Sequence, residues 1–241
     1  MQKQLHPWRL YLCAMESEAE QIIKHYGLNA YLTNSSRDIG NISRIDLGNN
    51  FQKIGNKFKI YVNDHNPGGA MLALTGVGKI NSAQALSYLL SIIKPSQIVN
   101  VGMCGSLKNQ KFNIGDIIRV VHVFQHDVYI PIHHIEFDSL LDKINLDVSK
   151  ISKEEYGIHF GTLATGDSFI DDEMSRYDLS QIADIVDMEG YSIAKICKDF
   201  GINCLMYKIV SDNADESATH NFKNSLEIYN EKLKFLLDNV F

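Results

Sequence analysis

Short apolar runs alternate with amphipathic segments along most of the chain. This alternation is typical of a sheet with helices packed on its faces, and it predicts an α/β fold. The predicted strands are 8–13, 42–47, 58–62, 71–75, 97–101, 116–123, 158–164, 185–187 and 204–210. The predicted helices are 18–26, 81–93, 137–144, 191–200 and 222–240. The predicted strands 42–47 and 58–62 alternate enough to be antiparallel and half exposed.

Two glycine-rich segments follow predicted strands. TGVGK, residues 75–79, precedes a helix and lacks both the GxxxxGK[ST] and the GxGxxG pattern, so a nucleotide-phosphate loop is not expected. VGMCGS, residues 101–106, reads as a second turn of the same kind. Either segment is explained by a tight turn alone, and either also allows backbone N–H groups to approach an anion or a water molecule.

Acidic side chains stand where predicted buried strands end. Glu18 follows the first strand, Asp187 and Glu189 flank a methionine, and Asp212 follows the last strand. Ligands of open α/β sheets bind at such strand ends, so these carboxylates are a candidate active site. Each acid also has a structural explanation, because acids stabilise the first turn of a helix and Asp is a common helix cap.

Composition narrows the function classes. The 241 residues include 23 Lys and Arg and 29 Asp and Glu, so the net charge is −6. A nucleic-acid-binding protein is usually rich in basic residues, so nucleic acid is not an expected partner. No Pro-, Ser- or Gly-rich linker interrupts the chain, which indicates a single domain over residues 1–241.

The expected compartment is the cytoplasm. The four cysteines lie in apolar surroundings without metal-type spacing, and the chain has neither a signal-peptide pattern nor an 18-residue apolar run that would indicate a membrane partner. His122, His126, His133 and His134 form a loop cluster without HExxH spacing, so no metal site is predicted.

Seven short blocks in register carry a resemblance to a known family. They are AMESE (14–18), TGVGK (75–79), NVGMCGSL (100–107), FNIGDII (112–118), TGDSFI (165–170), VDMEG (186–190) and VSDNAD (210–215). Over nearly its whole length the chain resembles the nucleoside phosphorylase superfamily, and within it the 5'-methylthioadenosine/S-adenosylhomocysteine nucleosidases. The resemblance implies a three-layer α/β/α sandwich with a central mixed sheet, a homodimer and no cofactor.

The resemblance implies catalytic roles for two acids. Glu18 matches the general base that activates the attacking water, and Asp212 matches the general acid that protonates purine N7. Ser211 matches the residue that orients Asp212. Adenine leaves readily only once N7 is protonated, so the acid must keep its proton near neutral pH.

The resemblance also implies a nucleoside pocket. Met188 and Glu189 match the pair that meets the ribose hydroxyls, Phe169 matches the aromatic that stacks on adenine, and the Ile170 backbone is expected at the base edge. Phe222 is expected to border the 5' substituent. Gly78 and Met103 complete the expected substrate-binding set.

Two alternatives within the same fold stay open. In a purine nucleoside phosphorylase, phosphate replaces water, and an arginine precedes the second glycine segment; here Asn100 stands there, which favours hydrolysis. Another purine nucleosidase, such as a futalosine hydrolase, would carry nearly the same motifs. Met103 and Cys104 replace smaller residues of the family, and Lys208 stands where its nucleosidases have Arg.

Overall fold

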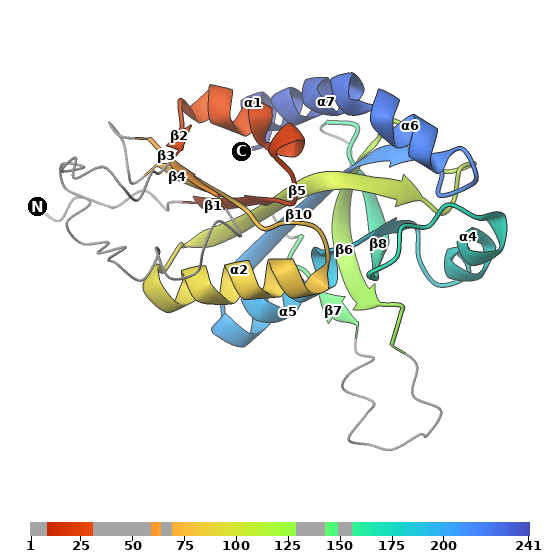
Figure 1. The fold of residues 1–241 in the computed structure, drawn as a ribbon, viewed down its shortest axis with the longest axis horizontal. Coiled ribbons are helices and arrows are strands. Elements are labelled where there is room, and N and C mark those ends of the chain that lie inside the picture. Colours follow the sequence, from red (N-terminus) through yellow and green to blue (C-terminus); the bar gives the residue numbers. More distant parts are fainter. Residues whose placement is uncertain (1–8, 31–58, 64–68, 129–142, 149–155) are drawn as a thin grey trace, which may run out of the picture.

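The fold is a three-layer α/β/α sandwich, as predicted. The computed structural model describes residues 9–30, 59–63, 69–128, 143–148 and 156–241. Figure 1 shows α1 and α7 over one face of the central sheet and α2 and α5 over the other, and the helices pair within each layer. The helices are α1 (Glu16–Tyr26), α2 (Lys79–Ile92), α4 (Glu173–Ser180), α5 (Gly190–Phe200), α6 (Ala218–Asn224) and α7 (Leu226–Asn239).

The sheet is mixed, and part of it closes on itself. Its strands are β1 (Arg9–Cys13), β2 (Asn29–Ala30), β3 (Ile60–Val62), β4 (Ala70–Leu74), β5 (Gln97–Ser106), β6 (Ile117–Gln125), β7 (Ile144–Asn145), β8 (His159–Thr165), β9 (Ile185–Asp187) and β10 (Asn203–Asp212). Strand β10 pairs with both β5 and β6, and β6, β8, β9 and β5 follow one another, so these five strands form a closed ring. Strands β1, β4, β3 and β2 extend the sheet outward from β5.

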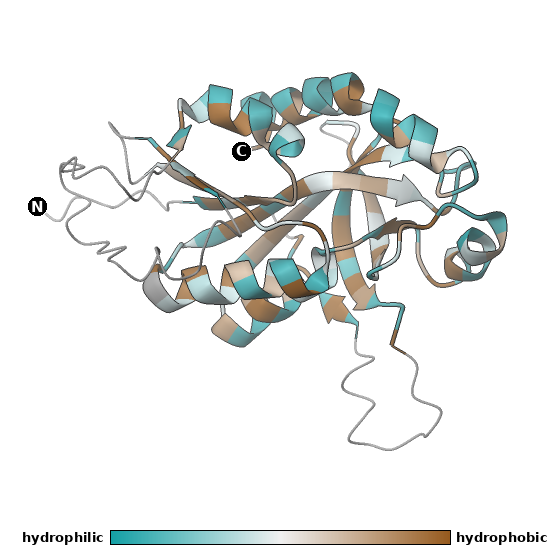
Figure 2. Ribbon diagram, viewed as in Figure 1, coloured by the Kyte–Doolittle hydropathy of each residue, from teal (hydrophilic) through white to brown (hydrophobic). Residues whose placement is uncertain are grey.

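Alternation along the strands builds the two largest of the three apolar clusters in the described part of the chain. In β1, Leu10 and Leu12 belong to one buried cluster, whereas Tyr11 and Cys13 belong to the other, because successive side chains point to opposite faces. Figure 2 shows apolar residues along the central strands and hydrophilic ones on much of the helix surfaces. No helix in the described part of the chain combines the length and apolar character that spanning a bilayer requires.

The second glycine-rich segment is not a turn. The predicted strand 97–101 continues to Ser106, so residues 101–106 are strand β5. Its glycines admit side chains from neighbouring elements: a Cβ at Gly102 would lie 3.0 Å from Glu18 Oε1, and one at Gly105 would lie 2.9 Å from Asp212 Oδ1. The glycines therefore serve close approach within the sheet rather than a change of chain direction.

The structure differs from several of the predicted helices, and one predicted strand lies outside the described residues. The predicted helix 137–144 is wrong at its end, because Ile144 pairs with Val123 in a two-strand ladder; its first six residues lie outside the described part. The predicted strand 42–47 also lies outside it. The last helix is two helices that meet at the buried Ser225. Helix α4 was not predicted, and it has no buried residue that would have given a periodic apolar signal.

Candidate active site

A cavity of about 360 Å³ collects the predicted site at the carboxyl ends of the strands. The predicted residues that line it are Glu18, Met103, Phe169, Ile170, Met188, Glu189, Ser211, Asp212 and Phe222. They come from the segments that follow β1, β8 and β9, from β5 and β10, and from α6. Gly78 does not line the cavity; its backbone N–H donates to Glu189 Oε1 at 2.8 Å.

Glu18 is a buried carboxylate at the start of α1. Its Oε2 accepts hydrogen bonds from the backbone N–H groups of Ala14 and Met15, each at 3.0 Å, and its Oε1 accepts one from Met103 at 2.9 Å. Burial raises the pKa of Glu18, while these N–H groups and the ammonium of Lys208 oppose the rise. The N–H groups fix the carboxylate in one orientation beside β5.

Asp212 ends β10 beside a break in the strand register. Ser211 Oγ donates to Asp212 Oδ2 at 2.7 Å, and the Ala214 N–H donates to Oδ1 at 2.9 Å. Burial raises the pKa of Asp212 above its ordinary value, and the two hydrogen bonds only partly oppose this. A carboxyl group in this setting retains its proton at a higher pH than an exposed aspartate does.

Glu189 opens helix α5 and faces the same cavity. Burial and the neighbouring Asp187 raise the pKa of Glu189 to about 8, against the effects of Lys208 and the Gly78 N–H. The cavity thus gathers three buried acids, Glu18, Glu189 and Asp212, each with a raised pKa. Such clustering is typical of catalytic sites.

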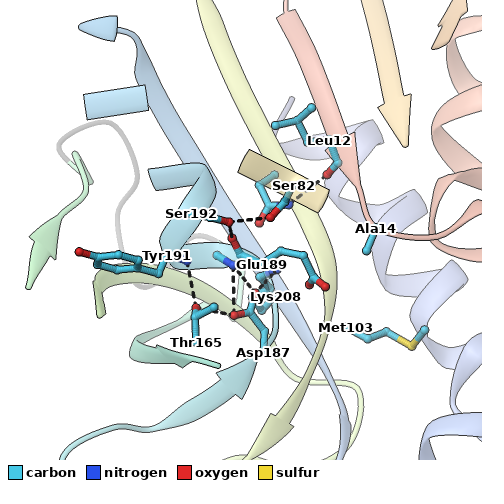
Figure 3. A network of polar contacts seen from close by, with 12 residues as sticks. Leu12, Ala14, Ser82, Met103, Thr165, Asp187, Glu189, Tyr191, Ser192 and Lys208 are labelled. Carbon is cyan, nitrogen blue, oxygen red and sulfur yellow. Dashed lines mark hydrogen bonds and ion pairs between the residues drawn. The ribbon is translucent and has the colours of Figure 1, made fainter. Parts of the chain in front are cut away.

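A buried ion pair lies beneath these acids. Lys208 Nζ is 2.8 Å from Asp187 Oδ2, and the two side chains are only 2% and 1% exposed (Figure 3). Asp187 Oδ1 also accepts a hydrogen bond from Thr165 Oγ1 at 2.6 Å, and the Gly190 N–H donates to the same carboxylate. Burial alone would lower the pKa of Lys208, but Asp187, Glu189 and Glu18 raise it, so the ammonium stays charged.

Two aromatic rings border the outer part of the cavity. Phe169, after β8, and Phe222, in α6, meet edge to face with ring centroids 5.9 Å apart. Val77, Thr219 and Lys223 line the cavity as well, although the sequence reasoning did not single them out. Helix α6 therefore contributes the polar Thr219 and Lys223 to the wall as well as the Phe222 ring.

The pairing of Lys208 with Asp187 is not among the predictions from the sequence. Asp187 is predicted there only as an acid at a strand end, and Lys208 only as a departure from the family pattern. A charged residue inside the apolar run CLMYKIV was the available signal, since a buried lysine needs a partner. In the described part of the chain, no group of three or more His, Cys, Asp or Glu residues is arranged to hold a metal ion.

Comparison with known proteins identifies the family of the chain. The family model described as "Phosphorylase superfamily" matches residues 9–241. The 5'-methylthioadenosine/S-adenosylhomocysteine nucleosidase of Buchnera aphidicola is 30% identical over 204 residues, covering 77% of this chain and 87% of the relative. The aminodeoxyfutalosine nucleosidase of Helicobacter pylori is 30% identical over 171 residues, covering 65% and 73%.

A solved structure shares the fold. The 5'-methylthioadenosine nucleosidase of Arabidopsis thaliana superimposes with a TM-score of 0.77 at 22% identity, over 97% of this chain and 93% of the other. The family match over residues 9–241 is the stronger finding, because it includes every strand that contributes to the cavity. The chain belongs to the phosphorylase superfamily.

Proposed function

We propose that the protein hydrolyses the N-glycosidic bond of adenine nucleosides, namely 5'-methylthioadenosine and S-adenosylhomocysteine, releasing adenine and the 5-substituted ribose. The observation that carries this proposal is that one cavity holds two differently arranged buried acids, Asp212 and Glu18. Curated relatives that are 30% identical carry the name of this activity. N-glycosidic cleavage requires an acid for the leaving group and a base for water.

Asp212 is the proposed general acid. Its raised pKa lets it hold a proton near neutral pH and deliver it to adenine N7 as the bond to ribose breaks. The Ser211 hydroxyl and the Ala214 N–H orient the carboxyl group and then stabilise the carboxylate that remains. No cofactor enters this step.

Glu18 is the proposed general base. Three backbone N–H groups and the ammonium of Lys208 stabilise its carboxylate form, so that it can take a proton from water. The water then adds to the ribosyl carbon while positive charge develops on the sugar ring. Carboxylates on the ribose side stabilise that charge in the transition state.

Glu189 and the aromatic residues are proposed to position the nucleoside. Glu189, held by the Gly78 N–H, and Met188 would meet the ribose, with Glu189 binding its 2'- and 3'-hydroxyls. Phe169 would stack on adenine, with the Ile170 backbone at the base edge. Met103 would form the wall near the ribose, and Phe222 would border the 5' substituent.

Asn100 favours hydrolysis over phosphorolysis. It is 2% exposed, and its Nδ2 donates to the Leu12 carbonyl at 3.1 Å, so this position offers no cation to a phosphate. Phosphate binding normally needs guanidinium or ammonium clamps. The second candidate is a purine nucleosidase whose substrate carries a different 5' substituent, since an aminodeoxyfutalosine nucleosidase is also 30% identical to this chain.

We also propose that residues 1–241 form one domain and that the protein acts in the cytoplasm as a homodimer. All four cysteines are free and buried, which suits a reducing compartment. The dimer proposal rests on the family resemblance alone. Light scattering coupled to size-exclusion chromatography would give twice the chain mass for a dimer and the chain mass if the proposal is wrong.

Product analysis on a panel of nucleosides tests the proposed activity. The panel contains 5'-methylthioadenosine, S-adenosylhomocysteine, aminodeoxyfutalosine and adenosine. We expect the two sulfur-containing nucleosides to react fastest; a strong preference for aminodeoxyfutalosine would support the second candidate instead.

Asp212→Asn should lower kcat by orders of magnitude, because an amide cannot supply the proton, and near-normal turnover would remove Asp212 from the mechanism.

A further inference from the structure

The glycine-rich segment TGVGK does more than turn the chain from β4 into α2. Two consecutive backbone N–H groups at its end donate to carboxylates from other parts of the chain. The Gly78 N–H donates to Glu189 Oε1, and the Lys79 N–H donates to Asp167 Oδ1, each at 2.8 Å. Glu189 precedes α5, and Asp167 lies in loop 166–172 between β8 and α4. The anions that meet this segment are therefore the protein's own side chains.

Asp127 and the side chain of Lys79 complete a ring of contacts with Asp167. Lys79 Nζ is 2.5 Å from Asp127 Oδ1, and Asp127 Oδ2 accepts a hydrogen bond from the Asp167 N–H at 2.8 Å. Asp127 follows β6, and β6 pairs with β8 in the sheet. The ring therefore joins the ends of two neighbouring strands to the start of α2.

The ion pair in this ring is partly shielded from solvent. The side chains of Lys79 and Asp127 are 17% and 25% exposed, whereas those of the surface pair Lys195 and Asp199 are 46% and 49% exposed. Burial would raise the pKa of Asp127, but the Lys79 ammonium and the Asp167 N–H bring it below its ordinary value, so Asp127 is charged at neutral pH. Charge-assisted hydrogen bonds of this kind are stronger than those between neutral groups.

The loop that the ring holds carries part of the catalytic cavity wall. Phe169 and Ile170 follow Asp167 closely and line the cavity. Ile170 is buried in an apolar cluster, but Phe169 is 43% exposed and meets Phe222 edge to face. Burial in the core therefore does not fix the Phe169 ring. Its position depends on the loop backbone between Asp167 on one side and Ile170 on the other.

We propose that Lys79 and Asp127 are positioning residues that hold Asp167, and through it Phe169, at the adenine end of the cavity. This inference rests on the proposed function, in which Phe169 stacks on adenine. Neither Lys79 nor Asp127 lines the cavity, so both act through the loop rather than on the substrate. A loop that is already held in its binding geometry loses less conformational freedom when the base binds, which favours binding.

Two binding measurements test the positioning role. The first is KM, with kcat, for 5'-methylthioadenosine, and the second is the Kd of free adenine by isothermal titration calorimetry. We expect Lys79→Met and Asp127→Ala each to raise both constants at least about fivefold, the lower end of what loss of a base–aromatic stack costs. Because stacking holds the base before and during bond cleavage, kcat should change little. A substitution that only destabilised the fold would lower the active fraction and leave KM and Kd unchanged.

Three further variants show whether the effect passes through the Phe169 ring. Lys79→Arg keeps the cation and should stay near the wild-type constants. In a Phe169→Ala background, Lys79→Met should raise the Kd of adenine no further, because the ring that it positions is gone. Lys195→Met, which breaks the exposed pair on α5, is the control and should keep KM and Kd.

The outcomes separate this inference from the proposed function. The positioning role is overturned if the wild type releases adenine while Lys79→Met or Asp127→Ala keeps its KM and Kd, or if the effects of Lys79→Met and Phe169→Ala add in full. The proposed function then stands. If the wild type neither binds adenine nor releases it from 5'-methylthioadenosine, the proposed function is wrong and the positioning role is overturned with it.

Discussion

Lys208 and Asp187 form a buried ion pair of 2.8 Å at the candidate active-site cavity, which Asp187 lines together with the other carboxylates. Lys208 also acts electrostatically on Glu18 and Glu189, and a Cβ at Gly102 would lie within 3.4 Å of its Nζ and 3.0 Å of Glu18 Oε1. One ammonium thus lies among three acids. Its charge favours the carboxylate form that the proposed role of Glu18 as a base requires, whereas burial favours the protonated form.

Removal of the lysine charge should destabilise the protein. Lys208→Met leaves Asp187 buried and unpaired, and we expect the free energy of unfolding to fall by about 3–5 kcal/mol in urea titrations. Lys208→Arg, which keeps the charge, should lose much less, and Lys208→Met combined with Asp187→Asn should recover part of the loss. An equal free energy of unfolding for Lys208→Met and the wild type would show that the ion pair does not stabilise the folded protein.

Ser211→Ala should move the alkaline limb of the pH–rate profile. The Ser211 hydroxyl donates to Asp212 and lowers the pKa of that carboxyl, so its removal raises the pKa further. Since the acid must be protonated to work, kcat/KM should fall at a higher pH in the variant than in the wild type. Ser180→Ala on exposed α4 is the control and should leave the limb in place. A shift toward lower pH would contradict the assignment.

Glu189 should make the unliganded protein less stable as the pH rises. Its pKa is raised to about 8 in the folded state from an ordinary value near 4.5, so the folded state binds the proton more tightly. Its contribution is therefore complete below about pH 4.5 and is lost as the pH rises through 8. Glu189→Gln should flatten the decline of Tm between pH 5 and 8 at constant ionic strength, and an unchanged slope would contradict the raised pKa.

Much of the catalytic cavity was predictable because strand ends follow directly from the apolar pattern. Glu18, Glu189 and Asp212 each stand after a recognisable buried run, and every predicted site residue except Gly78 lines the cavity. Gly78 was expected at the substrate, but instead its N–H holds Glu189, a contact between residues 111 positions apart. The motif blocks in register imply roles for these residues, which the apolar pattern alone leaves open.

Long-range packing explains what could not be predicted. The glycines of β5 resemble a turn in the sequence, because only the folded sheet reveals the Glu18 and Asp212 side chains that occupy the space of a Cβ. The Lys208 and Asp187 pair joins β10 and β9, which are consecutive along the chain but not paired with each other in the sheet. Helix α4 is capped at its N-terminus by Asp172, whose side chain accepts a hydrogen bond from the Ser175 N–H. It has no buried apolar residue that the sequence pattern could reveal.

Gly105→Ala should impair catalysis through Asp212. The added Cβ would lie 2.9 Å from Asp212 Oδ1 and 3.1 Å from the Ala214 Cβ, so the carboxyl group must move. Because a catalytic group that is displaced by up to about 1 Å no longer meets its substrate correctly, we expect kcat to fall by about 10–100-fold. Gly157→Ala is the control: its Cβ would meet nothing within 4 Å, so the substitution strains only the local backbone at φ +63° and should keep kcat. Normal kcat in Gly105→Ala would show that the position of Asp212 is not critical.

The most direct test of the account is the release of adenine from 5'-methylthioadenosine in phosphate-free buffer. We predict full activity without phosphate, no stimulation when phosphate is added, and 5-methylthioribose as the sugar product. Asn100 offers no cation to a phosphate, and Glu18 is proposed to activate water. Adenine release that requires phosphate and yields a sugar 1-phosphate would contradict the hydrolytic assignment.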